Sequence, residues 1–355
     1  MNTAPPVVRV LRKRDELDET AAAWDALPQA RANPLLGSRW FAAAARLHPD
    51  DALYVVTIET GTRLVAVAPL TQSRRNLVNR LEFIGARTLN EPSGLLAESP
   101  SHLMQLCDEL TGLRRPLLLQ RIPVDSNVES RLRQCARGKG RLFIARSAPC
   151  HRVDITGNWA DYLATRSSQV RSGMRRKRAI LGKTGTVSVD TRRPQPGELP
   201  SVFDEALDIE ADGWKGSGHS SMRSNDALRG FVVELARRFA ETGELQISFL
   251  RAGQRAVAMC LLLEFDRRLW EIKIGYRDSA RRASPGRLLL WETLRGAFEK
   301  GLRSYEFLGS GDSQQPDWAT SSQELHTLVY YPYSFAGIVA LVMDVMSHLL
   351  RRLRT

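Results

Sequence analysis

The fold of this chain is decided by residues 245–311, which read LQISFLRAGQRAVAMCLLLEFDRRLWEIKIGYRDSARRASPGRLLLWETLRGAFEKGLRSYEFLGSG. The pattern of apolar and polar residues predicts three strands joined by turns, then a basic loop, an apolar-periodic helix and a fourth strand. The basic loop runs from Arg281 to Arg287, directly before the helix. Free N–H groups and the positive dipole end at a helix N-terminus attract anions. The loop therefore predicts a site for a phosphate-rich ligand.

An internal repeat accompanies this stretch. Leu53–Leu70 aligns without a gap on Leu245–Leu262, and six of the eighteen positions are identical. Both copies read as hairpins with a glycine-containing turn. We interpret the repeat as a duplication offset by 192 residues; the alternative is chance similarity between two hairpins.

The two copies differ after the hairpin. In the first copy only a short strand, Leu81–Ile84, is expected before Pro92, and the basic loop is missing. If both halves share one fold, only the second half kept the phosphate site. The first half would then be structural or would shape the acceptor cleft.

Length and composition set broad bounds on the protein. The 355 residues suffice for two domains, and a hydrophobic content of 43% allows sizeable cores. The formal net charge of +12 favours an anionic partner. Such a partner could be a nucleotide cofactor, a nucleic acid, an acidic glycan or a membrane surface, and composition does not choose among them.

The cysteines and the N-terminus bear on the compartment. The four cysteines are far apart and form no Cys-x-x-Cys pair, so we expect buried free thiols, a reducing compartment and no metal site. The first residues lack an apolar core of signal-peptide length, and no run of about 20 apolar residues is present. We therefore expect a cytoplasmic protein, with peripheral association to the inner membrane as the further option.

Two helical stretches each leave two interpretations open. Phe335–Leu353 is predicted to be an amphipathic helix that either packs on the core or lies on a membrane surface or partner. Its apolar face comprises Ile338, Leu341, Val342, Val345, Leu349 and Leu353. Tyr162–Val189 contains no acid and seven bases, which form either a solvated face or a contact with an anionic ligand. The bases are Arg166, Arg171, Arg175, Arg176, Lys177, Arg178 and Lys183.

The order of three strands, an arginine-rich turn and a helix resembles the GCN5-related N-acetyltransferase (GNAT) fold. The cofactor signature of that fold is Gln/Arg-x-x-Gly-x-Gly/Ala, and Arg281-x-x-Ser284-x-Gly286 follows it with serine at the first glycine. Further phrases resemble the BioF2-like, or CelD (BcsL), acetyltransferases, which are tandem-GNAT proteins linked to bacterial cellulose and other exopolysaccharides. These phrases are Ala66-Val67-Ala68-Pro69-Leu70, Arg171–Arg178, Gly213-Trp214-Lys215-Gly216, Ser284-Pro285-Gly286 and Glu306-Phe307-Leu308-Gly309.

The resemblance implies an α+β fold of tandem GNAT-like halves, with mixed, mostly antiparallel sheets flanked by helices, as in the more remote FemABX peptidyltransferases. The expected domains are a degenerate N-terminal half (1–150), an acyl-CoA-binding C-terminal half (151–334) and an amphipathic helix (335–355). The implied activity is transfer of an acyl group from acetyl-CoA or another acyl-CoA. The acceptor would be the nitrogen or oxygen of a small molecule or glycan, a sugar or amine of exopolysaccharide or envelope synthesis.

Two alternatives to that activity stay open. One is a FemABX-like transferase that uses aminoacyl-tRNA, in which case tRNA is the one nucleic acid expected as a partner. The other is a non-catalytic acyl-CoA-binding protein. It is kept because the family often has a Tyr-Lys pair before a tryptophan, whereas Gln314-Gln315-Pro316-Asp317 precede Trp318 here.

The resemblance assigns the cofactor site residue by residue. The backbone of one strand would bind the pantetheine arm as an added strand does, through Ile274, Gly275 and Tyr276. Amides from Ser284 to Leu288 would hold the pyrophosphate, with counter-charge from Arg281, Arg282 and Arg287. Pro285 suits the first helical turn and Gly286 lets a phosphate approach the backbone. The basic helix around Arg171–Arg178 could reach the ribose phosphate of CoA.

Candidates for catalysis and acceptor binding are fewer. Glu271, on the strand that lines the cleft, is the first candidate base, and pairing with Lys273 or an arginine is its structural alternative. Asp312 is the second candidate base, with loop capping as its alternative. Trp214 and Lys215 suit a sugar or anionic acceptor, unless the tryptophan only packs over its loop.

Overall fold

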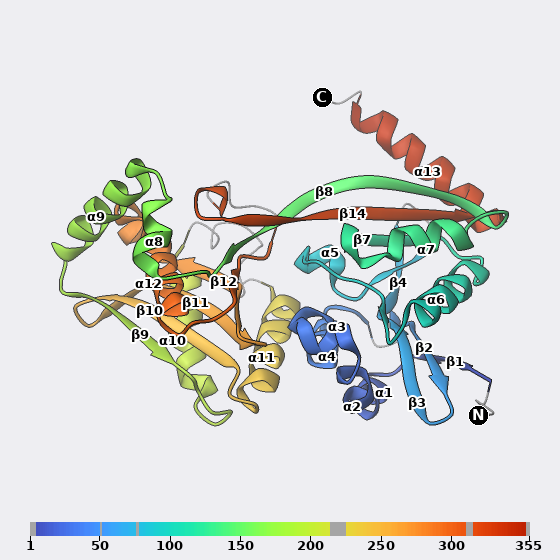
Figure 1. Ribbon diagram of the computed structural model, residues 1–355, viewed down its shortest axis with the longest axis horizontal. Helices are drawn as coiled ribbons and strands as arrows, with labels where there is room; N and C mark the ends of the chain where they lie inside the picture. Colours follow the sequence, from blue (N-terminus) through green and yellow to red (C-terminus); the bar gives the residue numbers. More distant parts are fainter. Residues whose placement is uncertain (1–4, 50–51, 76–77, 214–224, 310–314, 353–355) are drawn as a thin grey trace. The chain divides into compact units, whose positions relative to one another are not determined.

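The computed structural model describes residues 5–49, 52–75, 78–213, 225–309 and 315–352 (Figure 1). The chain divides into two compact units. The first unit comprises Met1–Pro149 and Gln323–Thr355, and the second comprises Cys150–Ser322. The chain enters the second unit within β8 (Gly140–Asp154) and returns within β14 (Ser321–Pro332). Residues 323–355 group with the first unit, whereas they were expected to belong to the second half and to a separate C-terminal helix.

The first unit contains two groups of paired strands with helices around them. One sheet has the order β1-β2-β3-β6, and β4, β5, β7 and β14 follow one another in the second group. The strands are β1 (Val7–Leu11), β2 (Val55–Thr60), β3 (Arg63–Ala68), β4 (Leu70–Arg75), β5 (Val78–Phe83), β6 (Leu96–Ala97) and β7 (Leu117–Pro123). The helices are α1 (Arg14–Glu19), α2 (Ala21–Asp25), α3 (Pro28–Ala32), α4 (Ser38–Ala44), α5 (Ala86–Leu89), α6 (Pro100–Gly112), α7 (Val128–Cys135) and α13 (Phe335–Arg352).

The second unit is built on strands in the order β8-β13-β12-β11-β10-β9. Its pairs are antiparallel except for β12 and β13, which are parallel. The strands are β9 (Val187–Arg192), β10 (Leu245–Ala252), β11 (Arg255–Phe265), β12 (Arg268–Tyr276) and β13 (Ser304–Glu306). The helices are α8 (Trp159–Ala164), α9 (Ser168–Gly182), α10 (Leu199–Ala211), α11 (Asp226–Ala240) and α12 (Pro285–Glu299).

The repeated hairpins have the same register in the two units. Val56 pairs with Ala68 in the first hairpin, as Ser248 pairs with Cys260 in the second, 192 residues later. Each hairpin also carries a one-residue register shift, after Ile58 in β2 and after Leu250 in β10, which are equivalent positions. A shared bulge is a specific backbone feature rather than a consequence of composition. The register therefore favours duplication over chance similarity.

The repeat continues beyond the hairpin. β1 pairs with β2 as β9 pairs with β10, and β6 pairs with β3 as β12 pairs with β11. After β6 and after β12 a helix begins at a Ser-Pro pair, Ser99-Pro100 at α6 and Ser284-Pro285 at α12. The strand expected at Leu81–Ile84 is β5, part of a hairpin with β4 rather than the counterpart of β12. The counterpart is the two-residue β6, too short to show a period in the sequence.

The helices α10 and α12 cover opposite faces of the second unit's sheet. An added Cβ on Gly275 would lie 3.3 Å from atoms of Glu210 in α10. An added Cβ on Gly286, in the first turn of α12, would instead meet Tyr276 and Ile274. Since successive strand residues point to opposite faces, β12 turns Gly275 to α10 and its neighbours to α12. This arrangement brings the end of β12 beside the start of α12.

The C-terminal helix α13 packs on a core cluster of the first unit, but mainly through a side other than the predicted apolar face. Ala340 is fully buried and groups with Val78 and Tyr331, but Ile338, Val342 and other residues of the predicted apolar face are exposed. The side of the helix that contains Ala340 faces the first unit. In the described part of the chain, no helix is long and apolar enough to cross a membrane.

Candidate active site at the fork between two strands

The second unit's sheet opens into a fork. β12 pairs in parallel with β13 over only three residues, and the last pair joins Trp270 to Glu306. The amide of Phe307 then donates to the carbonyl of His151, so the chain turns toward β8. β12 meanwhile continues to Tyr276. Among the described residues no strand pairs with this side of β12 beyond Trp270, which leaves an open strand edge.

The orientation of the β12 backbone decides which groups face the open edge. The amide of Arg277 donates to the carbonyl of Val257 at 2.9 Å. Because hydrogen bonding alternates along an antiparallel pair, the backbone groups of Tyr276 and Ile274 point away from β11, into the fork. The backbone groups of Gly275 face Met259 of β11 instead. Ile274 and Tyr276, two of the three residues expected to bind the pantetheine arm, therefore present their backbone N–H and C=O groups to the open edge. The third residue, Gly275, has no side chain and so allows α10 to approach the strand.

The open edge leads to the N-terminus of α12. A 3-10 turn, Asp278–Ala283, connects the two elements, and Ser284 adopts a left-handed conformation with φ of 45°. The Ser284 side chain makes no capping hydrogen bond to the helix, and Pro285 has no N–H group. The amides of Gly286 and Arg287 therefore have no acceptor within the helix. They present two donors and the positive helix end next to Tyr276.

The arginines expected to supply counter-charge occupy different environments. Arg281 and Arg282 are exposed, and Arg281 lies 4.0 Å from a carboxylate oxygen of Asp278. Arg287 is partly buried and pairs with Asp317 at 3.3 Å. Positive charge thus surrounds the α12 N-terminus on its solvent side.

A lysine from the basic helix completes this cluster. The Nζ atom of Lys177, in α9, donates to Ser284 Oγ at 2.8 Å. Burial, together with the charges of Arg287 and Arg176, lowers the pKa of Lys177. Its neighbour Arg178 instead forms an ion pair with Glu292 of α12 at 2.5 Å. The sequence indicated a basic helix but could not show which of its cations reaches the loop.

A carboxylate stands at the point where the strands part. Glu271 is the first residue of β12 beyond the last pair with β13. Its side chain accepts a hydrogen bond of 2.7 Å from the hydroxyl of Tyr305, which is fully buried. Burial, with the charges of Glu271 and Cys260, raises the pKa of Tyr305 well above its usual value, so Tyr305 stays a donor. The alternative partner of Glu271, Lys273, lies 3.1 Å from Glu210.

Two further features at the base of the fork were not predicted. Glu306 is largely buried, and burial raises its pKa although Ser304 donates to it at 2.6 Å. Leu308 is a buried residue with φ of 53°, a conformation that is strained for a bulky side chain. Their only signal in the sequence was the phrase Glu306-Phe307-Leu308-Gly309.

Three predicted residues lie outside the described part of the chain, namely Asp312, Trp214 and Lys215. Gly213, which precedes the last two, lies against the end of β12, since an added Cβ would be 2.6 Å from the carbonyl oxygen of Tyr276. In the described ranges, no group of three or more His, Cys, Asp or Glu side chains is arranged to hold a metal ion. All four cysteines are buried free thiols, as expected.

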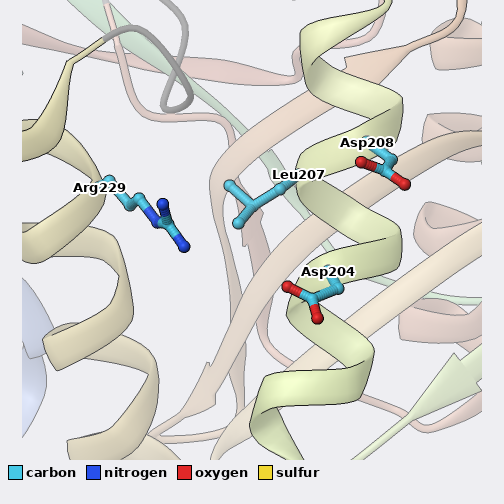
Figure 2. A pocket seen from close by; sticks show the side chains of 4 residues that line it. All are labelled: Asp204, Leu207, Asp208 and Arg229. Atoms are coloured by element: carbon cyan, nitrogen blue, oxygen red, sulfur yellow. The ribbon is translucent and has the colours of Figure 1, made fainter.

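A separate hollow of about 380 Å³ lies between α10 and α11 (Figure 2). Asp204, Leu207 and Asp208 come from α10, and Arg229 comes from α11. Its mixed charges include none of the groups at the fork. The fork, rather than this hollow, is therefore the candidate active site.

Comparison with known proteins agrees with this geometry. Residues 168–317 match the family described as "Acetyltransferase (GNAT) domain", a range that includes the fork, α9 and α12. No curated protein sequence matches the chain.

Similar solved structures cover more than 90% of the chain. FemX is 12% identical, with a TM-score of 0.59 over 92% of this chain and 98% of its own. L-PGS from Bacillus licheniformis is 10% identical, with a TM-score of 0.56 over 96% and 99%. The C-terminal domain of a putative lysylphosphatidylglycerol synthetase from Agrobacterium fabrum is 13% identical, with a TM-score of 0.54 over 94% and 98%. These likenesses concern the fold and confirm the architecture expected from the sequence. Residues 168–317 thus match the acetyltransferase (GNAT) domain family, in a chain with a FemX-like fold.

Proposed function

We propose that the second unit transfers an acyl group, an acetyl group in the first instance, from acyl-CoA to an amine or hydroxyl. The observation that carries this proposal is the continuity of the fork with the α12 N-terminus. An open strand edge at Ile274 and Tyr276 suits the amide-bearing pantetheine arm, because the arm can pair with it as a strand would. The edge ends beside the unpaired amides of Gly286 and Arg287, which suit a pyrophosphate.

The charges around α12 favour the same ligand. Lys177 is fixed at Ser284, and Arg287 is held by Asp317 next to the helix start. Arg281 and Arg282 remain exposed to meet the outer phosphates. These cations lie at different distances from the N-terminus of α12, so they could pair with several phosphates of one ligand.

The chemistry proposed at the fork is direct transfer. The acceptor nitrogen or oxygen attacks the thioester carbonyl, a C–N or C–O bond forms, and the C–S bond breaks. Glu271 would take the proton of the acceptor, directly or through water, and the CoA thiolate would leave and be protonated. Backbone N–H groups of the open edge would stabilise the oxyanion. Tyr305 would hold the Glu271 carboxylate in place.

The acceptor is proposed from the sequence resemblance. The BioF2-like and CelD acetyltransferases suggest a sugar or amine of exopolysaccharide or envelope synthesis, with the protein acting in the cytoplasm. Trp214 and Lys215, in the segment that follows Gly213, are the proposed acceptor contacts.

A second candidate is transfer of an aminoacyl group from tRNA. The observation that favours it is the composition and place of α9. This helix contains several basic residues and no acidic one, and it contacts α12 and the turn before it. The likeness to FemX is consistent with this reading. A helix of this kind suits a polyanion longer than CoA.

Calorimetric titration of the full chain with acetyl-CoA tests the proposal. Binding together with release of free CoA thiol in the presence of amine or sugar acceptors is the expected result. Absence of binding would overturn the proposal. Binding without turnover across the acceptors would indicate an acyl-CoA-binding accessory protein. Tight tRNA binding that weakens steeply with salt would favour the second candidate.

A further inference from the structure

The C-terminal helix α13 carries a continuous apolar stripe on its outer side. The residues of this apolar stripe are between 49% and 84% exposed, and they are Phe335, Ile338, Val342, Val345, Met346, Leu349 and Leu350. Their spacing of three and four residues places them on one face of the helix. Single exposed apolar residues are ordinary, whereas a contiguous patch of this kind marks an interaction surface. Figure 1 shows α13 running away from the end of β14 toward the C-terminus.

The opposite side of α13 is attached to the first unit. Ala340 is fully buried against a cluster that contains Val78 and Tyr331. The guanidinium of the buried Arg80 donates to the carboxylate of Asp344 at 2.6 and 2.8 Å. The hydroxyl of Tyr331 donates to the same carboxylate at 2.6 Å. The helix is therefore held without help from whatever covers the apolar stripe.

The charges around the apolar stripe distinguish between its candidate occupants. Asp344 is the one acidic residue in the sequence of α13, and it faces Arg80. At the start of the helix the exposed Arg114 donates to the carbonyl of Tyr333 at 3.3 Å. At the other end the sequence continues with Arg351, Arg352 and Arg354. Both ends of the stripe are therefore basic.

This charge pattern disfavours a second copy of the chain. Two copies paired along the stripe would bring basic ends together in either direction, with no acid on the stripe to offset them, and each chain carries a net charge of +12. An anionic bilayer surface is complementary to both features. Apolar side chains can enter the acyl boundary, while flanking arginines meet lipid phosphates and the exposed aromatics Tyr333 and Phe335 lie at the interface.

We propose that α13 is a peripheral membrane anchor, lying in the plane of a bilayer that contains anionic lipid, with the apolar stripe facing the acyl chains. The helix lies on the bilayer rather than crossing it, in agreement with its hydropathy. The proposal does not depend on the acyltransferase activity. It concerns where the first unit attaches, not what the second unit does.

Co-sedimentation with vesicles tests the anchor. The full chain is mixed with phosphatidylcholine vesicles, with or without about 30% phosphatidylglycerol, at low and at physiological salt. The test variant is Val342→Glu/Val345→Glu, which places two carboxylates on the stripe. The control is Val233→Glu, because Val233 is an exposed valine on another helix, 44% exposed in α11. Equal thermal unfolding of the three proteins shows that folding is retained.

The expected result is binding to the anionic vesicles only, weakened by salt and reduced about tenfold or more by the double substitution but not by Val233→Glu. Absence of binding to anionic vesicles at low salt would overturn the proposal. So would unchanged binding of the double variant. A dimer detected by light scattering, dispersed by the double substitution and without vesicle binding, would instead assign the stripe to a second copy.

Discussion

Lys177 Nζ lies 2.8 Å from Ser284 Oγ, so a cation from α9 is fixed at the residue that precedes α12. Burial and two neighbouring arginines lower the pKa of this lysine. The lowered pKa reflects repulsion between the lysine and the two arginines, and the negative charge of a bound phosphate would offset it. The cations are therefore already in place for an anion before the ligand arrives. The hydrogen bond connects the basic helix α9 with the basic loop Arg281–Arg287, two features that are separate in the sequence.

Lys177→Met should weaken acetyl-CoA binding by about tenfold, which corresponds to ~1.4 kcal/mol, because one preplaced cation is lost. The salt dependence of binding should also decrease. Calorimetry at several salt concentrations measures both. Lys183→Met is the matched control, since Lys183 is an exposed lysine just after α9. Equal effects of the two substitutions would show that only net charge matters.

Gly286→Glu should abolish acetyl-CoA binding by placing a carboxylate at the proposed pyrophosphate position. Gly286→Ala is its control. An added Cβ would lie 3.4 Å from the Tyr276 ring, an ordinary van der Waals distance, so alanine should be tolerated. Unchanged affinity of the glutamate variant would refute the phosphate site, whereas loss of binding in both variants would point to crowding.

Glu271→Gln should lower kcat by a factor of about 10² to 10⁴, as expected when a general base is removed, while acetyl-CoA affinity is kept. Steady-state kinetics together with calorimetry separates the two quantities. A variant that retains full kcat would exclude Glu271 as the base and leave Asp312 as the next candidate.

Tyr305→Phe should act through Glu271, because the phenol donates to that carboxylate and is fully buried. A lost hydrogen bond to a carboxylate disfavours its charged form, so the acid limb of the kcat/KM profile should move to higher pH. The wild-type profile should show no titration of Tyr305, whose pKa is raised well above its usual value. A lower rate with an unmoved profile would indicate a purely structural role.

Asp344→Asn should loosen α13, because it leaves the buried Arg80 without its carboxylate. Removing one partner of a buried ion pair typically costs about 3–5 kcal/mol. Hydrogen exchange of the α13 amides measures the effect locally, which suits a chain with two units. The double variant Arg80→Met/Asp344→Asn should recover part of the protection, and protection unchanged in Asp344→Asn would contradict the anchoring role of the pair.

The features that the sequence predicted well are carried by neighbouring residues. Each repeated hairpin depends on alternation and on one turn, and the start of α12 depends on Ser284, Pro285 and the periodicity that follows. Such signals do not require knowledge of distant segments. The sequence does not predict β6, because two residues cannot display a period. The strand that it does predict before Pro92 is β5, which pairs with β4.

The sequence by itself determined the tandem architecture and the position of the basic loop Arg281–Arg287, because local patterns specify strands, turns and helix ends. Only the tertiary structure decided which side chains meet. Lys177 and Ser284 are 107 residues apart, and Glu271 and Tyr305 are 34 apart. The apolar face of α13 reads the same in the sequence whether it is buried or exposed. Its exposure follows from the ion pair of Arg80 and Asp344, 264 residues apart, which turns the other side of the helix inward.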